Sequence, residues 1–292
     1  MIDQTVREIK EMRTHSSSTV AIKAATALHS LTERNARTVE EFFNTVERNA
    51  RMLRQANPSH ASLHSTMHEI VAEVRSSDAG TVDEAETALV RAIDGNIERI
   101  ERATDRAAVA AMEVIDDGDC ILTHDFSTTV LTYANHATSS NRQHDFVVTE
   151  ARPRVMGRRM ARHLADLDGI DVTLIVDSAA GHMLDTVDRV LVGMDCIVDG
   201  KLFNRVGTYP LAACAHQENV PVSVIGAGTK IIDSGFVFTN DYRSSVEVIR
   251  EPTPEFAVEN PAYDATPMEL ITSVISDAGV ESIESATAST PE

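Results

Sequence analysis

The first 115 residues carry apolar side chains at the spacing of amphipathic helices. Two series show this pattern: Val39, Phe42, Phe43 and Val46, then Leu89, Ile93, Ile97 and Ile100. Breaks at 57–59 and 76–80, where proline, glycine and small polar residues gather, divide this part into roughly four or five helices. The pattern predicts a helical N-terminal domain over residues 1–115.

From residue 116 onward, the apolar residues form short runs instead. The runs cover 120–123, 146–149, 172–176, 189–193 and 222–225, with helix-like stretches between them. This alternation is typical of β-α-β units and of a parallel sheet with helices on both faces. The expected fold class is therefore α/β, with a Rossmann-like, doubly wound parallel sheet over residues 116–280. Residues 281–292 are mostly small and polar and predict a disordered tail.

Charge narrows the range of partners. The 292 residues carry a formal net charge of −19 at pH 7, so we expect no direct binding to nucleic acid. Only four basic residues are lysines, namely Lys10, Lys23, Lys201 and Lys230. An acidic, lysine-poor surface suits a protein kept soluble at high salt, and a halophilic source is our hypothesis.

Cysteine usage and hydropathy bear on the compartment. Cys120, Cys196 and Cys214 lie in apolar runs, and their odd number predicts reduced, buried thiols. The longest apolar runs are too short to span a membrane, and the N-terminus lacks a basic stretch followed by an apolar block. We expect a cytoplasmic protein with no membrane partner.

Polar residues follow the predicted strands, where ligands of such sheets bind. Asp125 follows the first run and Asp195 the fourth. Two carboxylates, one protonated and one ionised, are the arrangement that acid–base chemistry on a sugar needs. Alternatively, each carboxylate caps the following helix. Both hypotheses stay open for Asp125, whereas Asp195 lies in an apolar run, where a cap is less natural.

Basic side chains follow other strands. Arg152 and Arg154 are placed to hold a phosphate, although an arginine at a strand end is most often solvated or ion-paired. Asn204 and Arg205 belong to a second polar cluster. The histidines lack partners at ligand spacing, so we expect neither a metal site nor a cofactor.

Six segments of the second half resemble one known family in content and order. They are 121–130, 150–157, 177–180, 192–200, 204–212 and 260–272. The family contains the alpha, beta and delta subunits of translation initiation factor 2B, their archaeal homologues, and the related ribose-1,5-bisphosphate and methylthioribose-1-phosphate isomerases. The resemblance spans most of residues 116–280 and implies a helical half followed by a Rossmann-like half.

The resemblance also indicates two departures from the isomerases. Their chemistry uses a cysteine after a ThrHis pair and an aspartate in a Gly-x-Asp motif; here Asp125 stands at the cysteine position and Asp195 keeps the aspartate. Their Arg-Gly-Ala segment, which holds a phosphate, is replaced by 12–24, which resembles the Ser/Thr-rich segment of the regulatory subunits. The resemblance implies ligand-binding roles for His15, Ser16, Ser17, His124, Ser127, Arg152, Asn204 and Arg205.

Three functions agree with these features. The first is an initiation factor 2B-related regulatory protein that binds a sugar phosphate or a nucleotide at the sheet edge. The alternative is an aldose–ketose isomerase of a ribose phosphate, with Asp125 in place of the cysteine and Asp195 as acid/base. The third is a structural subunit whose pocket stays empty. The resemblance implies a homo-oligomer, a dimer through the C-terminal half or a larger assembly, and initiation factor 2 components as further partners.

Overall fold

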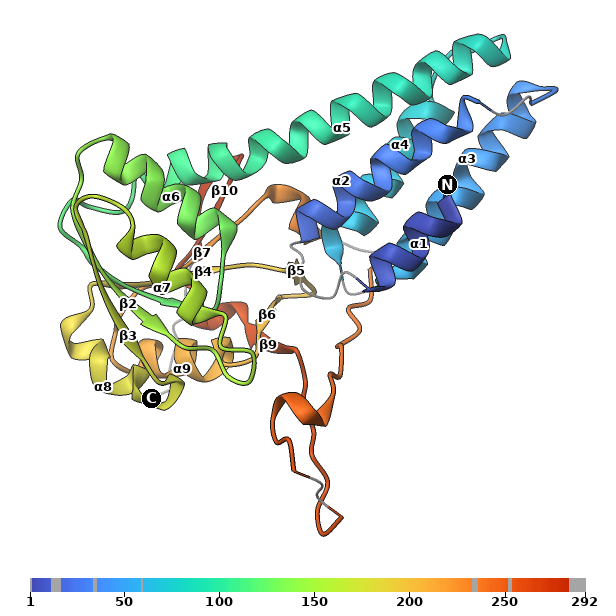
Figure 1. The fold of residues 1–292 in the computed structure, drawn as a ribbon. Coiled ribbons are helices and arrows are strands. Elements are labelled where there is room, and N and C mark those ends of the chain that lie inside the picture. The colour runs from blue at the N-terminus through green and yellow to red at the C-terminus, as the bar shows by residue number, and fades with distance from the viewer. Residues whose placement is uncertain are drawn as a thin grey trace, which may run out of the picture. The chain divides into compact units, whose positions relative to one another are not determined.

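The computed structural model describes residues 2–11, 17–33, 36–58, 60–232, 236–251 and 254–283 (Figure 1). The chain divides into two compact units. One contains Met1–Arg102 and Thr229–Thr239, and the other contains Ala103–Gly228 and Asn240–Glu292. The division falls inside one long helix and again on both sides of the segment Thr229–Thr239.

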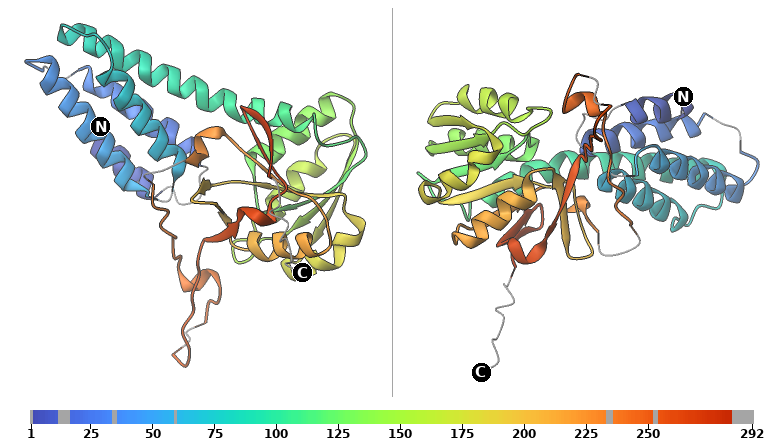
Figure 2. Two further views of the ribbon diagram at one scale, coloured as in Figure 1. Left: turned by 180° about the vertical axis from the view of Figure 1, so that it is seen from behind. Right: turned by 90° about the horizontal axis from the view of Figure 1, so that it is seen from below.

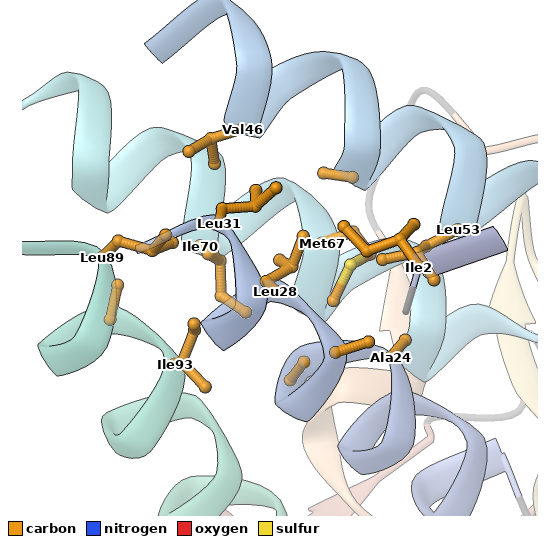
Figure 3. Packing of buried hydrophobic residues seen from close by; sticks show 14 of the residues in the cluster. Ile2, Ala24, Leu28, Leu31, Val46, Leu53, Met67, Ile70, Leu89 and Ile93 are labelled. Carbon is orange, nitrogen blue, oxygen red and sulfur yellow. The ribbon is translucent and has the colours of Figure 1, made fainter. Parts of the chain in front are cut away.

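The first unit is helical. Its helices are α1 (Ile2–Glu11), α2 (Ser17–Leu28), α3 (Val39–Ala56), α4 (Ala61–Arg75) and the first part of α5 (Val82–Ala111). Helix α3 begins after Thr38, whose hydroxyl accepts the backbone N–H of Glu41. The apolar faces meet in one core, where Leu28, Met67 and Ile93 are fully buried (Figure 3). Each such side chain contributes about 1.5–3 kcal/mol by leaving water.

The second unit contains a seven-stranded sheet in the order β11-β10-β7-β4-β1-β2-β3. Its strands are β1 (Cys120–His124), β2 (His144–Thr149), β3 (Ile170–Ile175), β4 (Arg189–Gly193), β7 (Val222–Ile225), β10 (Ser273–Ser276) and β11 (Gly279–Ser282). All neighbours pair in parallel except β10 and β11. The five apolar runs of the sequence form β1, β2, β3, β4 and β7. The predicted fold class, a helical region followed by a mostly parallel α/β sheet, is confirmed.

Helices cover both faces of this sheet (Figure 2). On one face, α6 (Thr128–Ser139), α7 (Gly157–Ala165) and the end of α5 enclose a core that includes Tyr133, Phe146 and Met160. The other face carries α8 (Ala180–Met183) and α9 (Thr208–Gln217), with α9 packed on β4 and β7.

A smaller antiparallel sheet positions part of the candidate site. Strands β5 (Cys196–Val198) and β6 (Lys201–Arg205) form a hairpin, and β9 (Tyr263–Pro267) pairs with β6. The hairpin turns through Asp199 and Gly200, both of which have positive φ, as a tight two-residue turn requires. The register places Arg205 opposite Tyr263. Strand β8 (Ile231–Ile232) lies in the segment 229–239 of the helical unit.

Three sequence expectations meet the structure here. The expected disordered tail, 281–292, starts within β11, and residues 284–292 lie outside the described residues. The expectation of buried thiols holds for Cys196 but is wrong for Cys214, which is exposed because α9 buries its opposite face; Cys120 is half-buried. In the described residues, none of the helices combines the length and apolar character that a membrane span needs.

Candidate active site

Asp125 lies directly beyond β1, where the chain turns sharply. Its φ of 63° is in the left-handed region, which aspartate tolerates better than most residues. The hydroxyl of Ser127 accepts the N–H of Val130 at 3.3 Å and caps α6. The hypothesis that Asp125 caps this helix is therefore wrong, and Ser127, predicted as a ligand-binding residue, takes that structural role.

Asp195 and Arg205 come from the two ends of the β5–β6 hairpin. The N–H of Asp195 donates to the carbonyl of Phe203 at 3.1 Å, which fixes Asp195 next to β6. The Nε atom of Arg205 lies 3.5 Å from Oδ2 of Asp195 and 3.6 Å from Oδ2 of Asp125. The structure thus brings together three predicted residues, and one guanidinium serves both carboxylates.

The environment affects the charges of Asp125 and Arg205 differently. Burial raises the pKa of Asp125. The charges of Arg205 and His124 oppose this rise and the carboxylate of Asp195 adds to it, and the pKa stays raised overall. Burial alone would lower the pKa of Arg205, but Asp195, Tyr263 and Asp125 raise it above its usual value. Arg205 therefore stays charged, while Asp125 holds a proton more readily than an ordinary aspartate.

The aromatic ring of Tyr263 packs against the guanidinium of Arg205. The guanidinium carbon lies 4.9 Å from the centre of the Tyr263 ring, within the range of a cation–π contact. Burial and then the charge of Asp195 raise the pKa of Tyr263 to about 12. The N–H of Tyr263 donates to Asn240, whose amide nitrogen donates to the Tyr263 carbonyl. Sequence reasoning missed Tyr263, although it lies in the segment 260–272.

His124 has two hydrogen-bonding partners within the protein. Its Nε2 atom lies 2.8 Å from the carbonyl of Val206 and its Nδ1 atom 2.6 Å from the hydroxyl of Thr149. Because a carbonyl only accepts, Nε2 carries the proton, and in the neutral ring Nδ1 accepts from Thr149. Gly207 has φ +108°, and a Cβ there would lie 2.6 Å from the His124 ring. His124 thus joins β1 to β2 and to the start of α9, and its contact with a ligand stays a prediction.

Arg152 and Arg154 follow β2 and face the segment 240–248. The N–H of Arg152 donates to the carboxylate of Asp177 at 2.7 Å, and its guanidinium donates to the carbonyl of Val248 at 3.3 Å. The Nε atom of Arg154 lies 4.0 Å from Oε1 of Glu247. Both arginines therefore have protein partners, and their phosphate-binding role stays a prediction.

Asn204 is buried on β6, and its amide nitrogen donates to the hydroxyl of Thr208 at 3.2 Å. Beside it, the carboxylate of Asp264 accepts the N–H groups of Gly207 and Tyr209 at 2.7 and 3.0 Å. Asp264 thus places a negative charge at the positive end of α9. The segment around Asn204 is held by these bonds.

The remaining predicted ligand-binding residues belong to the N-terminal region. Ser17 is buried at the start of α2, and its hydroxyl accepts the N–H of Ser62 at 3.3 Å. His15 and Ser16 lie outside the described residues. In the described part of the chain, no cluster of His, Cys, Asp and Glu is arranged to hold a metal ion.

Known proteins resemble most of the chain. Residues 13–282 match the model of the initiation factor 2 subunit family. Ribose 1,5-bisphosphate isomerase of Haloferax volcanii is 32% identical over 287 residues, which cover 95% of this chain and 88% of that protein. Methylthioribose-1-phosphate isomerase of Pelotomaculum thermopropionicum is 32% identical over 273 residues, 84% of this chain and 72% of that protein.

A solved structure extends the likeness to the fold. The translation initiation factor eIF-2B of Pyrococcus horikoshii OT3 has a TM-score of 0.80 and 26% identity, with 97% of both chains covered.

Proposed function

Because the chain belongs to the initiation factor 2 subunit family, we propose that it converts a phosphorylated aldose of the ribose phosphate class into the corresponding ketose. One observation carries the proposal: Asp125 and Asp195 contact the same guanidinium nitrogen beyond the ends of parallel strands. The relatives named as isomerases of ribose 1,5-bisphosphate and methylthioribose 1-phosphate support this substrate class better than a purely regulatory role.

The chemistry moves protons and needs no oxidant. These aldoses carry a phosphate on the oxygen of C1, so the sugar ring has to open: protonated Asp125 gives its proton to the ring oxygen as the bond from that oxygen to C1 breaks, and Asp195 takes the proton from C2. The resulting enol, with its double bond between C1 and C2, returns one proton to Asp125 from the oxygen on C2 and receives the other from Asp195 at C1, which gives the ketose. Arg205 stabilises the negative charge that develops on the oxygen of C2. Burial of Asp125 favours the protonated form that the first step uses.

Polar residues near Asp125 and Asp195 are proposed to bind the ligand's phosphate. Arg152, Asn204 and Arg205 are the proposed phosphate ligands, and the first two are held in place by Val248 and Thr208. An arginine that is already ordered loses less side-chain entropy when the anion arrives. His124 and Ser127, which flank Asp125 in the sequence, and Ser17 remain proposed ligand contacts.

A second candidate function is a sensor that binds the sugar phosphate or a nucleotide without turnover. The observation that favours it is the same Arg205, because its positive charge favours the ionised form of Asp125 and so opposes Asp125 as an acid. Association with initiation factor 2 components belongs to this candidate.

Proton NMR at high salt decides between the two. We expect the wild-type protein to form ketose from ribose 1,5-bisphosphate or a related aldose phosphate, and Asp195→Asn to lose about 100-fold or more of that rate while still broadening the ligand signals. Asp171→Asn, an exposed aspartate on β3, makes the same chemical change away from the site and is expected to keep the rate. Binding without turnover in the wild type would establish the sensor, and absence of both would reject both candidates.

We also propose that the protein forms a homodimer through the sheet-containing unit. Strand β3 lies at the edge of the sheet, and Leu174 and Val176 beside this edge are 45% and 55% exposed. Apolar side chains on an open edge favour contact with another chain. Sedimentation velocity is expected to show a dimer that Val176→Lys weakens; a wild-type monomer throughout the micromolar range would contradict the proposal.

A further inference from the structure

Two more arginines approach Arg205 from other elements. Arg154 comes from the loop after β2, and Arg243 lies in the segment 240–248, which precedes β9 in the chain. The segment is fixed at both ends: Asn240 exchanges hydrogen bonds with the backbone of Tyr263, and Asn260 donates to Ser244 and Glu247. The guanidinium of Arg205 packs on the ring of Tyr263, and Glu247 lies near the side chain of Arg154. One short segment thus brings three guanidinium groups into one region.

The three cations influence each other. The side chain of Arg243 is only 6% exposed, whereas those of Arg205 and Arg154 are 22% and 26% exposed. Burial lowers the pKa of Arg243, and the positive charges of Arg205 and Arg154 lower it further. Like charges brought together in a partly buried region repel each other strongly, because the local dielectric constant is low. An anion placed among them relieves that repulsion.

Arg154 and Arg205 lie too far from their partner carboxylates for strong ion pairs. Arg154 lies 4.0 Å from Glu247, and Arg205 lies 3.5 and 3.6 Å from its two aspartates. Charge-assisted bonds of guanidinium groups are about 2.7–2.9 Å long. Elsewhere in the same unit, Arg158 approaches Glu150 to 2.6 Å. The loose pairs leave room for an anionic group to bind the exposed guanidinium groups at shorter range.

We propose that Arg154 and Arg243 form, beside Arg205, an anion subsite that binds a second phosphate group of the sugar ligand and so selects a bisphosphate over a monophosphate. Arg154, a quarter exposed, makes the direct contact. Arg243, nearly covered, adds positive potential from behind and is kept in place near Asp241, whose Oδ2 lies 3.9 Å from its Nε. This inference rests on the proposed function, since the sugar has to lie at Asp125 and Asp195 for its phosphate to reach these arginines.

Isothermal titration tests the subsite with two probes, ribose 1,5-bisphosphate and ribose 5-phosphate, at one fixed concentration of potassium chloride. We expect Arg154→Gln and Arg243→Gln to weaken binding of the bisphosphate about tenfold or more and binding of the monophosphate much less, because the first loses the charged contact to the second phosphate and the second loses the positive potential behind that contact. Arg154→Lys keeps the charge and is expected to recover part of the loss. Arg250→Gln removes an exposed arginine from the neighbouring stretch and is the matched control.

The outcomes separate this inference from the proposed function. Equal losses for both probes, or no loss in either variant, overturn the subsite even if the wild type turns over substrate. A selective loss without turnover in the wild type supports the subsite and rejects the isomerase. Failure of the wild type to bind either probe rejects both. Circular dichroism shows whether Arg243→Gln, the more buried change, lowers the melting temperature. If it does, the test relies on Arg154→Gln alone.

Discussion

Asp125 combines an unusual backbone conformation with an unfavourable place for a charge. The left-handed φ suits aspartate and asparagine alike, so replacement of one by the other leaves the turn after β1 intact. Burial raises the pKa of the carboxyl group in the folded protein, whereas in the unfolded chain it titrates near its ordinary value of about 3.9. The ionised form of Asp125 is therefore destabilising relative to an uncharged amide.

Comparison of the wild type with Asp125→Asn tests this directly. The contribution of Asp125 to stability is fully present below the unfolded pKa and is lost as pH rises through the raised folded pKa. Relative to the variant, the wild type is expected to lose free energy of unfolding as pH rises from about 3.9, the unfolded pKa, through the raised folded pKa. Urea denaturation of both proteins over a series of pH values from the unfolded pKa upward measures the change. A difference that grows in favour of the wild type at higher pH would show that Arg205 outweighs burial.

Sequence reasoning could find these carboxylates and Arg205, but not the contacts that hold Arg205 in place. Asp125 and Asp195 directly follow apolar runs, which predicts their position at the sheet edge. The contact of Arg205 with Tyr263 depends on the register between β6 and β9, and Arg243 reaches the site only because the segment 240–248 is fastened to β9. No local spacing encodes such contacts. The cap of α6 illustrates the same limit, since Asp125 and Ser127 are both good capping residues by type.

At the scale of elements, buried central strands were predictable and the smaller sheet was not. Strands β1, β2, β4 and β7 read as apolar runs because helices cover both faces of the parallel sheet. Strand β5 has only 3 residues, β6 alternates between buried and more exposed positions, and β9 is buried only at Tyr263 and Thr266. The antiparallel end of the large sheet, β10 and β11, depends on tertiary pairing with β7. The candidate site draws on both kinds of element: Asn204 and Arg205 were predicted as site residues, but the strand pairing that positions them was not.

Helix α9 depends on a carboxylate from another element. Asp264 on β9 accepts the N–H groups of Gly207 and Tyr209, and its negative charge lies at the positive end of the helix. Asp264→Ala removes two charge-assisted bonds and is expected to cost about 2–3 kcal/mol of unfolding free energy, measured by denaturant titration. Asp264→Asn keeps an acceptor oxygen and is expected to lose less. Equal losses for the two variants would mean that a neutral acceptor recovers none of the stability, and a negligible loss for Asp264→Ala would mean that the charge and the bonds contribute little.

At the scale of the whole molecule, the net charge of −19 governs the response to salt. Uncompensated negative charges repel each other in the compact state, and potassium chloride shortens the range of that repulsion from about 30 Å at 0.01 M to about 3 Å at 1 M. The melting temperature is expected to rise steadily over this range in a thermal scan. An uncharged osmolyte at equal osmolality serves as control, and a melting temperature that stays level or falls with salt would contradict the halophilic hypothesis.

The division of the chain also limits how this protein can change over generations. Helix α5 runs through the boundary at residue 102, and the helical unit takes up Thr229–Thr239, where the ring of Phe236 packs edge-on against His64 at 5.1 Å. A gene fragment that ends at residue 102 encodes the helices without Thr229–Thr239. A fragment that begins there encodes the sheet together with Thr229–Thr239, which belongs to the helical unit. A single recombination at residue 102 therefore transfers neither unit whole.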